Sequence, residues 1–352
     1  MNIYEQQESN RRMTWGIMLV FVAFFLFIGL GFDYFYLNFN PAKPAALVEN
    51  SAGYYEAASP ASRQSIPFGT IISLLIGCGM AANSMFNGSA MVLRSTMARK
   101  AVSSLDKGSN KEQQYLNVVA EMALAAGISP PPAAYIVPDP DLNAFATGIS
   151  PDKSSIAVTE GLLNTLNREE LQGVVAHEMS HIRNYDIRLM TITAALIGAI
   201  CLISDLAGRS MRLRSYGGSS GGRSSNDRSK GGGAAMLVLF VVWVILVILA
   251  PFLSRLLAMA ISRQREYLAD ASGAELTRNP QSLISALEKI RAAVMPTKAI
   301  NNGVAHMCIA DPRGSLIEER SGFVADLLAT HPPMEKRILA LKVMAYQSAK
   351  AR

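Results

Sequence analysis

Cysteine is scarce in this chain, and the three that occur, Cys78, Cys201 and Cys308, are far apart. No two of them form a CxxC pair, so the sequence offers neither a disulfide framework nor a cysteine-based redox motif. A GxSxG element is also missing, and none of the cysteines lies in a catalytic motif with a histidine. The sequence therefore gives no indication of a serine or cysteine hydrolase. The run GGSSGG lacks the strand, the lysine and the helix that a phosphate-binding loop requires.

Charge is scarce as well, because 17% of the residues are charged against about 25% in soluble domains. Half of the residues are hydrophobic, and the mean hydropathy is +0.22. Four stretches carry no charge at all: 13–32, 64–93, 189–204 and 231–254. Three of them reach the about 20 residues that a helix needs to cross a bilayer, whereas the third reaches only about 24 Å. The composition therefore predicts a mainly α-helical membrane protein.

We expect an N-terminal membrane region at residues 1–93 with two transmembrane helices, at about 13–32 and 67–90. The first apolar run is long and ends without a small-residue cleavage pattern, so a retained anchor is favoured over a signal peptide. Residues 94–352 are polar in character and predict a second domain. An apolar helical hairpin at about 189–204 and 234–254 interrupts that domain.

The hairpin is connected by loop 206–233, whose Gly, Ser and Arg content predicts flexibility. The net charge of +6 gathers beside apolar runs, which favours anionic lipid headgroups over nucleic acid as its partner. Loop 33–66 holds two basic residues and 94–111 holds five, so the positive-inside rule places residues 94 onward in the cytoplasm. Loop 205–230, with six basic residues, disagrees: either the rule fails there or the hairpin does not cross fully.

The polar domain predicts a small sheet among helices. Amphipathic spacing predicts a helix over KEQQYLNVVAEMALAAG, and β-like pieces follow at AAYIV, NAFAT and SSIAVT between turn residues. Thr159 is placed to open one helix, and Asn167 is placed as the N-cap of the next. Further helices are expected over the segments SRQREYLADASGAELT, PQSLISALEKIRAAV and MEKRILALKVMAYQ, the last preceded by two prolines.

The helix after Asn167 carries the pattern HEMSH. His177 and His181 are four residues apart and share one helical face, where two imidazoles can take adjacent corners of a tetrahedral zinc site. Glu178 between them can act as general base on a water that the metal activates. We expect this helix to run on without a break into the apolar stretch that follows.

A zinc site of this kind needs a third protein ligand. His306 and His331 are available, but Glu266 and Asp270 in SRQREYLAD share a helical face, so one can bind metal while the other orients a histidine. If the hairpin pairs antiparallel, His181 lies about 12 Å from one apolar run and Glu266 about 18 Å from the other. The histidines and the acidic pair would then lie at comparable distances from the apolar hairpin.

HEMSH followed by SRQREYLAD, together with NAFATG and THPPMEKRI, resembles the HtpX-type membrane zinc metalloproteases from about residue 94 onward. These are relatives of the CAAX prenyl proteases within the gluzincin superfamily. The resemblance implies transmembrane helices plus a gluzincin-like α+β zinc protease domain with a small sheet. It also implies one Zn²⁺ per chain and Glu266 as the third ligand.

The resemblance assigns further roles. It implies that Asn143, Ala144 and Phe145 lie on an edge strand and pair with an extended substrate. His331 would stabilise the oxyanion. Similar proteins often carry an acid at the position of Asp186, although an ideal helix turns this residue about 140° away from His181. Arg337 falls in the HPPxxxRI stretch and is expected to form a structural salt bridge.

The resulting hypothesis is a zinc-dependent endopeptidase of the bacterial inner membrane, multi-pass, with its catalytic domain in the cytoplasm. The resemblance suggests that it cuts extended or misfolded membrane proteins in a quality-control or stress response. Two alternatives stay open: a dedicated processing protease of the CAAX type, and a non-proteolytic membrane scaffold or holdase with a structural zinc site. The sequence leaves the oligomeric state undetermined.

Overall fold

Two long apolar helices stand at the start of the chain, α1 (Ile3–Tyr36) and α2 (Phe68–Ser95). Within them, the segments Gln7–Phe35 and Phe68–Ser95 are long and apolar enough to cross a membrane. The two N-terminal membrane helices expected from the uncharged runs therefore correspond to α1 and α2. Together with the small sheet of the polar domain, they confirm the predicted fold class.

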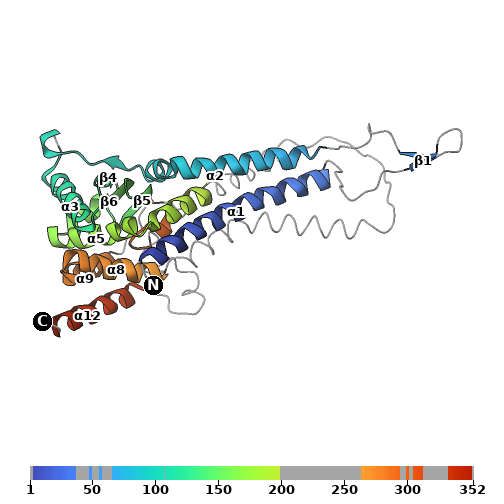
Figure 1. Cartoon of the computed structure of the whole chain (residues 1–352). Coiled ribbons are helices and arrows are strands. Elements are labelled where there is room, and N and C mark those ends of the chain that lie inside the picture. Colours follow the sequence, from blue (N-terminus) through green and yellow to red (C-terminus); the bar gives the residue numbers. More distant parts are fainter. Residues whose placement is uncertain are drawn as a thin grey trace. The chain divides into compact units, whose positions relative to one another are not determined.

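The computed structural model (Figure 1) describes residues 3–36, 47–49, 55–57, 66–106, 108–198, 263–293, 299–300, 304–311 and 332–350. The chain divides into two units, one made of residues 1–16, 83–201 and 252–352 and the other of 17–82 and 202–251. Both runs of the expected hairpin lie outside the described residues, apart from 189–198. Loop 206–233 also lies outside them.

The unit of residues 17–82 holds most of α1, the start of α2 and a short hairpin of β1 (Leu47–Glu49) and β2 (Tyr55–Ala57). Asp33 is buried and joins the two helices, because its carboxylate accepts hydrogen bonds from the backbone N–H groups of Gly69 and Thr70 at 2.8 and 2.7 Å. These N–H groups belong to the first turn of α2 and have no partner within the helix. Asp33 thus caps α2 from the end of α1.

The other unit contains a four-stranded sheet of β3 (Arg99–Lys100), β4 (Ala133–Val137), β6 (Lys153–Thr159) and β5 (Ala144–Ser150), in that order. β4 and β6 are parallel, while β3 and β5 are antiparallel to their neighbours, with Phe145 opposite Ala157. The three β-like pieces read from the sequence are confirmed as β4, β5 and β6. β5 lies at one end of the strand order, as an edge strand.

Some helices of this unit contact the sheet, and the others pack on those helices (Figure 1). They are α3 (Asn110–Ala126), α4 (Glu160–Thr165), α5 (Arg168–Arg183), α8 (Arg263–Thr277), α9 (Pro280–Ala292) and α12 (Met334–Lys350), with short 3₁₀ turns η2 (Ser104–Asp106) and η3 (Ala305–Met307). α5 is central, because it contacts α3, α8, α9 and β5 and is buried almost throughout. Its predicted N-cap is confirmed: Asn167 and Glu170 form a reciprocal capping box.

The expectation that α5 continues unbroken into the next apolar run is wrong. α5 ends at Arg183, Asn184 caps it, and Tyr185 has a positive φ of 60° that no regular helix contains. A new helix starts at residue 186 and continues through 198. The side chains of Leu189, Ile192 and Ile197 in this segment are buried within the protein.

Gly273 in α8 sets the distance between α8 and α5. A Cβ at this position would lie 2.9 Å from the backbone nitrogen of His177 and 3.1 Å from its Cα, so neither helix can move closer. Gly273→Ala should therefore destabilise the protein by about 1–3 kcal/mol through overpacking, although Ala ordinarily favours a helix over Gly. Thermal unfolding in detergent measures the effect. Gly79→Ala in α2 is the control, because nothing lies within 4 Å of its new Cβ. An unchanged midpoint of thermal unfolding for Gly273→Ala would contradict the expectation.

Candidate metal centre

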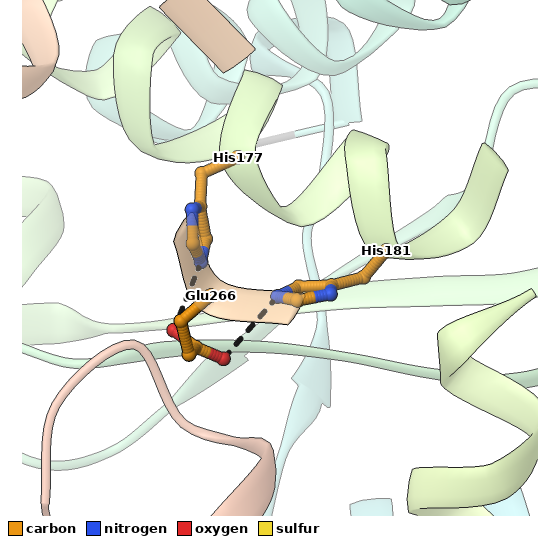
Figure 2. Close-up of side chains that lie close together, drawn as sticks. All are labelled: His177, His181 and Glu266. Atoms are coloured by element: carbon orange, nitrogen blue, oxygen red, sulfur yellow. Dashed lines mark ion pairs between the residues drawn. The ribbon is translucent and has the colours of Figure 1, made fainter. Parts of the chain in front are cut away.

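Three side chains from two helices converge in the interior. His177 and His181 project from consecutive turns of α5, with ring centroids 4.9 Å apart and nearly perpendicular planes. Glu266, from the first turn of α8, points at both rings (Figure 2). Its Oε2 lies 3.7 Å from His177 Nε2, and its Oε1 lies 3.6 Å from His181 Nε2. All three side chains are almost completely buried.

The geometry of this cluster fits a metal ion. One donor atom from each residue lies within 4.8 Å of the others, whereas tetrahedral zinc with bonds of about 2.0–2.2 Å sets donor atoms about 3.3–3.5 Å apart. Small side-chain adjustments would bring the three donors to that spacing. Two imidazoles and a carboxylate are also a donor set that zinc uses in catalytic sites. These three residues could therefore hold the metal.

The charge balance points the same way. Among the residues that the structure describes, four buried carboxyl groups, from Glu178, Asp186, Glu266 and Asp270, lie in or beside the cluster, and Arg265 and Arg337 face them. Burial acts to lower the pKa of His181, but the hydrogen bond to Asp186 and the neighbouring carboxylates outweigh it and raise that pKa to about 9. The site thus attracts positive charge, and a divalent cation would supply it.

Each histidine has a carboxylate on its other nitrogen. His177 Nδ1 lies 3.0 Å from Asp270 Oδ1, and His181 Nδ1 lies 3.1 Å from Asp186 Oδ2. A proton held on Nδ1 of His181 by Asp186 leaves its Nε2 with a lone pair, and the Nε2 atoms of both histidines face Glu266. His177 Nδ1 is close to Asp270 but is not aligned for a hydrogen bond, so this contact is an ion-pair contact only.

The break in the helix explains why Asp186 reaches His181. On a straight helix, Asp186 would lie about 140° around the axis from His181. Because α5 ends at Arg183 and Tyr185 adopts a positive φ, the chain changes direction and returns the carboxylate to the ring. Asn184 offered a signal, since Asn is favoured at helix C-termini.

Arg337 of α12 is completely buried and links the cluster to the end of the chain. It binds Asp270 through two hydrogen bonds, Nε to Oδ2 at 2.8 Å and Nη2 to Oδ1 at 2.7 Å. Its Nη1 donates to the carbonyl of Ile309 at 2.7 Å and lies 3.2 Å from Glu266 Oε2. Burial acts to raise the pKa of Asp270, but Arg337 and His177 lower it on balance, so this carboxylate stays charged.

Glu178 lies between the two histidines in sequence and is also buried. Burial raises the pKa of its carboxyl group, against the opposing influence of His177, His181 and Arg337. Its Oε2 is inaccessible to solvent and has no hydrogen-bond donor among the residues that the structure describes. A buried carboxyl oxygen without a donor is unusual and leaves Glu178 ready to accept a proton.

The edge of β5 is covered in this structure. The carbonyl of Ala144 accepts a hydrogen bond from the N–H of Ile309 at 2.9 Å, and Phe145 pairs with Cys308 in an antiparallel bridge. The side chain of Asn143 donates to the carbonyl of Ala310 at 3.1 Å. Residues 308–310 thus lie where the resemblance places a substrate strand. His331, the expected oxyanion donor, lies outside the described residues.

Two side chains near the centre were given no role by the sequence, although Arg265 lies within the segment SRQREYLAD. Arg265, next to the ligand Glu266, places its Nε 3.8 Å from Asp186 Oδ1. Asn10, from the first turns of α1, places its Nδ2 2.6 Å from the same oxygen. Neither contact could be read from spacing, because both residues lie far from Asp186 along the chain.

Comparison with known proteins identifies the class. Peptidase family M48 matches residues 109–345, a span that includes every residue of the candidate centre except Asn10. The chain belongs to this metallopeptidase family. It is 38% identical to a protease HtpX homolog of Streptococcus gordonii and 39% identical to one of Streptococcus pyogenes, each over 97% of this chain and 100% of the relative. The protein is therefore a membrane-associated protease of the HtpX type.

The crystal structure of S. mikatae Ste24p aligns with 79% of this chain and with 59% of the Ste24p chain. The sequence identity is 17% and the TM-score is 0.42.

Asp270→Asn should weaken metal binding. The neutral amide removes the charge that His177 Nδ1 and Arg337 face, so the affinity for Zn²⁺ is expected to fall about 10–100-fold. Competition with a chromogenic chelator measures the affinity. Glu121→Gln is the matched control, because Glu121 also pairs with an arginine, Arg168, but on the surface. Equal affinity in wild type and Asp270→Asn would show that Asp270 only packs.

Proposed function

We propose that this protein is a zinc-dependent membrane endopeptidase that hydrolyses peptide bonds of extended or misfolded membrane proteins. The observation that carries the proposal is the convergence of His177, His181 and Glu266 beside a buried, donor-free oxygen of Glu178. Such an acid has no purpose in a structural metal site. Its presence favours an enzyme over a scaffold or holdase.

Zinc suits the donor set best. Imidazole nitrogen and carboxylate oxygen bind zinc at matching distances, and three protein ligands leave one position open. When bound, the ion supplies Lewis acidity toward a peptide carbonyl and lowers the pKa of water toward about 7. His177 and His181 would hold the ion through their Nε2 atoms, and Glu266 would hold it through its carboxylate.

Glu178 performs the proton transfers in this proposal. Its carboxylate accepts a proton from the water that attacks the scissile carbonyl, and it then gives that proton to the leaving amine. Burial raises its pKa from the ordinary range of a glutamate toward the working pH. This suits both steps, since one group must act first as base and then as acid.

Asp186 keeps His181 in the binding tautomer by holding its Nδ1 proton, and Asp270 lies 3.0 Å from Nδ1 of His177 as a charged neighbour. Arg337 in turn fixes Asp270 with two parallel hydrogen bonds, so the carboxylate cannot rotate away from His177. Arg337 therefore acts as a structural ion pair within the centre.

An extended substrate is proposed to pair with β5 through Asn143, Ala144 and Phe145. The outward carbonyl of Ala144 is already bonded to Ile309, so residues 308–310 must leave before a substrate strand can take the same bonds. His331 is proposed as a donor to the oxyanion, on the strength of its place in the family motif.

The candidate membrane helices and the charge distribution support a bacterial inner-membrane location with the catalytic domain in the cytoplasm. A role in the quality control of membrane proteins is proposed from the resemblance to the HtpX-type proteases. The alternative is a processing protease with one dedicated substrate. A comparison of cleavage sites in cells with active and inactive enzyme separates the two, because quality control yields many substrates.

Glu178→Gln should abolish proteolysis while leaving metal binding intact. The amide matches the carboxylate in size but cannot accept the proton of the attacking water, so the rate is expected to fall by a factor of about 10² or more. The assay is cleavage of an unfolded protein by enzyme purified with a chelator and then supplied with Zn²⁺. If wild type binds zinc stoichiometrically but cuts no unfolded or membrane substrate, the protease proposal fails.

Glu266→Ala should lose the metal. Wild-type apoprotein is expected to gain about 3–4 kcal/mol of stability when Zn²⁺ is present at about 100–1,000 times its Kd, because the ion binds only the folded state. Glu266→Ala should show no such gain in a thermal unfolding experiment. Stoichiometric zinc in Glu266→Ala would refute the ligand assignment.

A further inference from the structure

The first turns of α1 dock against the end of α5. The side-chain amide of Asn10 donates to Asp186 Oδ1 at 2.6 Å and to the carbonyl of Asn184 at 3.2 Å. Gln7, one turn earlier, donates to the carbonyl of Arg183 at 3.3 Å. These carbonyls belong to the last residues of a helix, which have no partner within it. α1 thus caps α5 at the point where the chain breaks.

The orientation of the Asn10 amide is determined by its neighbours. Both atoms that it faces, Asp186 Oδ1 and the carbonyl oxygen of Asn184, can only accept, so the NH₂ group must point toward them. Asn10 is 3% exposed, so water does not compete for these bonds. The bond to the charged carboxylate is the stronger of the two.

Asp186 is held from two sides. Oδ1 receives the N–H of Asn10 and faces the more distant Arg265 Nε at 3.8 Å, while Oδ2 receives His181 Nδ1 at 3.1 Å. A completely buried carboxylate needs such donors to remain charged. Rotation of the carboxylate about its Cβ–Cγ bond would break the hydrogen bond from Asn10 to Oδ1, so this bond keeps Oδ2 on the imidazole.

We propose that Asn10 is a positioning residue of the metal centre. It acts through Asp186 on His181, so the first helix of the chain takes part in building the zinc site of the catalytic domain. This inference rests on the metal centre of the proposed function. The contact joins two residues that are 176 positions apart in the chain. Through this contact, α1 would contribute to the metal centre in addition to anchoring the protein in the membrane.

Metal affinity and metal spectroscopy test the proposal. Asn10→Ala removes the donor, and Asn10→Asp replaces it with an acceptor that repels Asp186. Each substitution should lower the affinity for Zn²⁺ about tenfold or more. Chelator competition with the full-length protein in detergent measures this affinity. The visible absorption bands of bound Co²⁺ should shift as well, since the orientation of His181 changes. The double variant Asn10→Asp with Asp186→Asn restores a donor–acceptor pair and should recover affinity relative to Asn10→Asp alone.

Arg12→Ala is the control on the same helix, because it removes only an exposed ion pair with Glu8 and should change neither readout. If Asn10→Ala and Asn10→Asp lower the unfolding temperature but keep wild-type affinity and the wild-type Co²⁺ spectrum, Asn10 merely supports the fold and the proposal is overturned. If Asn10→Asp does not fold, Asn10→Ala decides on the same two readouts. A wild-type protein that binds no metal would instead refute the proposed function itself.

Discussion

The close approach of α8 to α5 is the constraint on which the metal centre depends. Gly273 lets the two backbones come within van der Waals contact at His177, and Glu266, two turns earlier on α8, then reaches between the two rings. Glutamate and histidine side chains have a limited reach. If α5 and α8 were further apart by the width of one side chain, the three donor atoms would be too far apart to bind one ion. The packing of two helices thus fixes the geometry of the chemistry.

That packing also buries an excess of acid, and the protein compensates for it in stages. Arg337 neutralises Asp270, and the amide of Asn10 and the guanidinium of Arg265 face Asp186. Glu266 and Glu178 lie nearest the site of the ion. Buried charges destabilise a folded protein unless they are paired. A divalent cation bound among these carboxylates would therefore stabilise the folded protein.

The local parts of this arrangement could be predicted from the sequence. His177, Glu178 and His181 follow from helix spacing, and Asn167 as N-cap follows from residue type, because both depend on nearby residues alone. Asp186 could not be placed, since its position depends on a break at Asn184 that a distant asparagine helps to hold. Likewise, the edge of β5 could be predicted but not its cover, because residues 308–310 have no periodic pattern.

The two-bond contact between Arg337 and Asp270 has a consequence for biosynthesis. A ribosome completes α5 and α8 well before it adds α12, so the growing chain holds the metal ligands while Asp270 still lacks its arginine. Burying that acid alone would cost about 3–5 kcal/mol, which keeps the unfinished centre from closing. Closure of the metal centre in the growing chain therefore depends on α12, which supplies the cation that Asp270 faces.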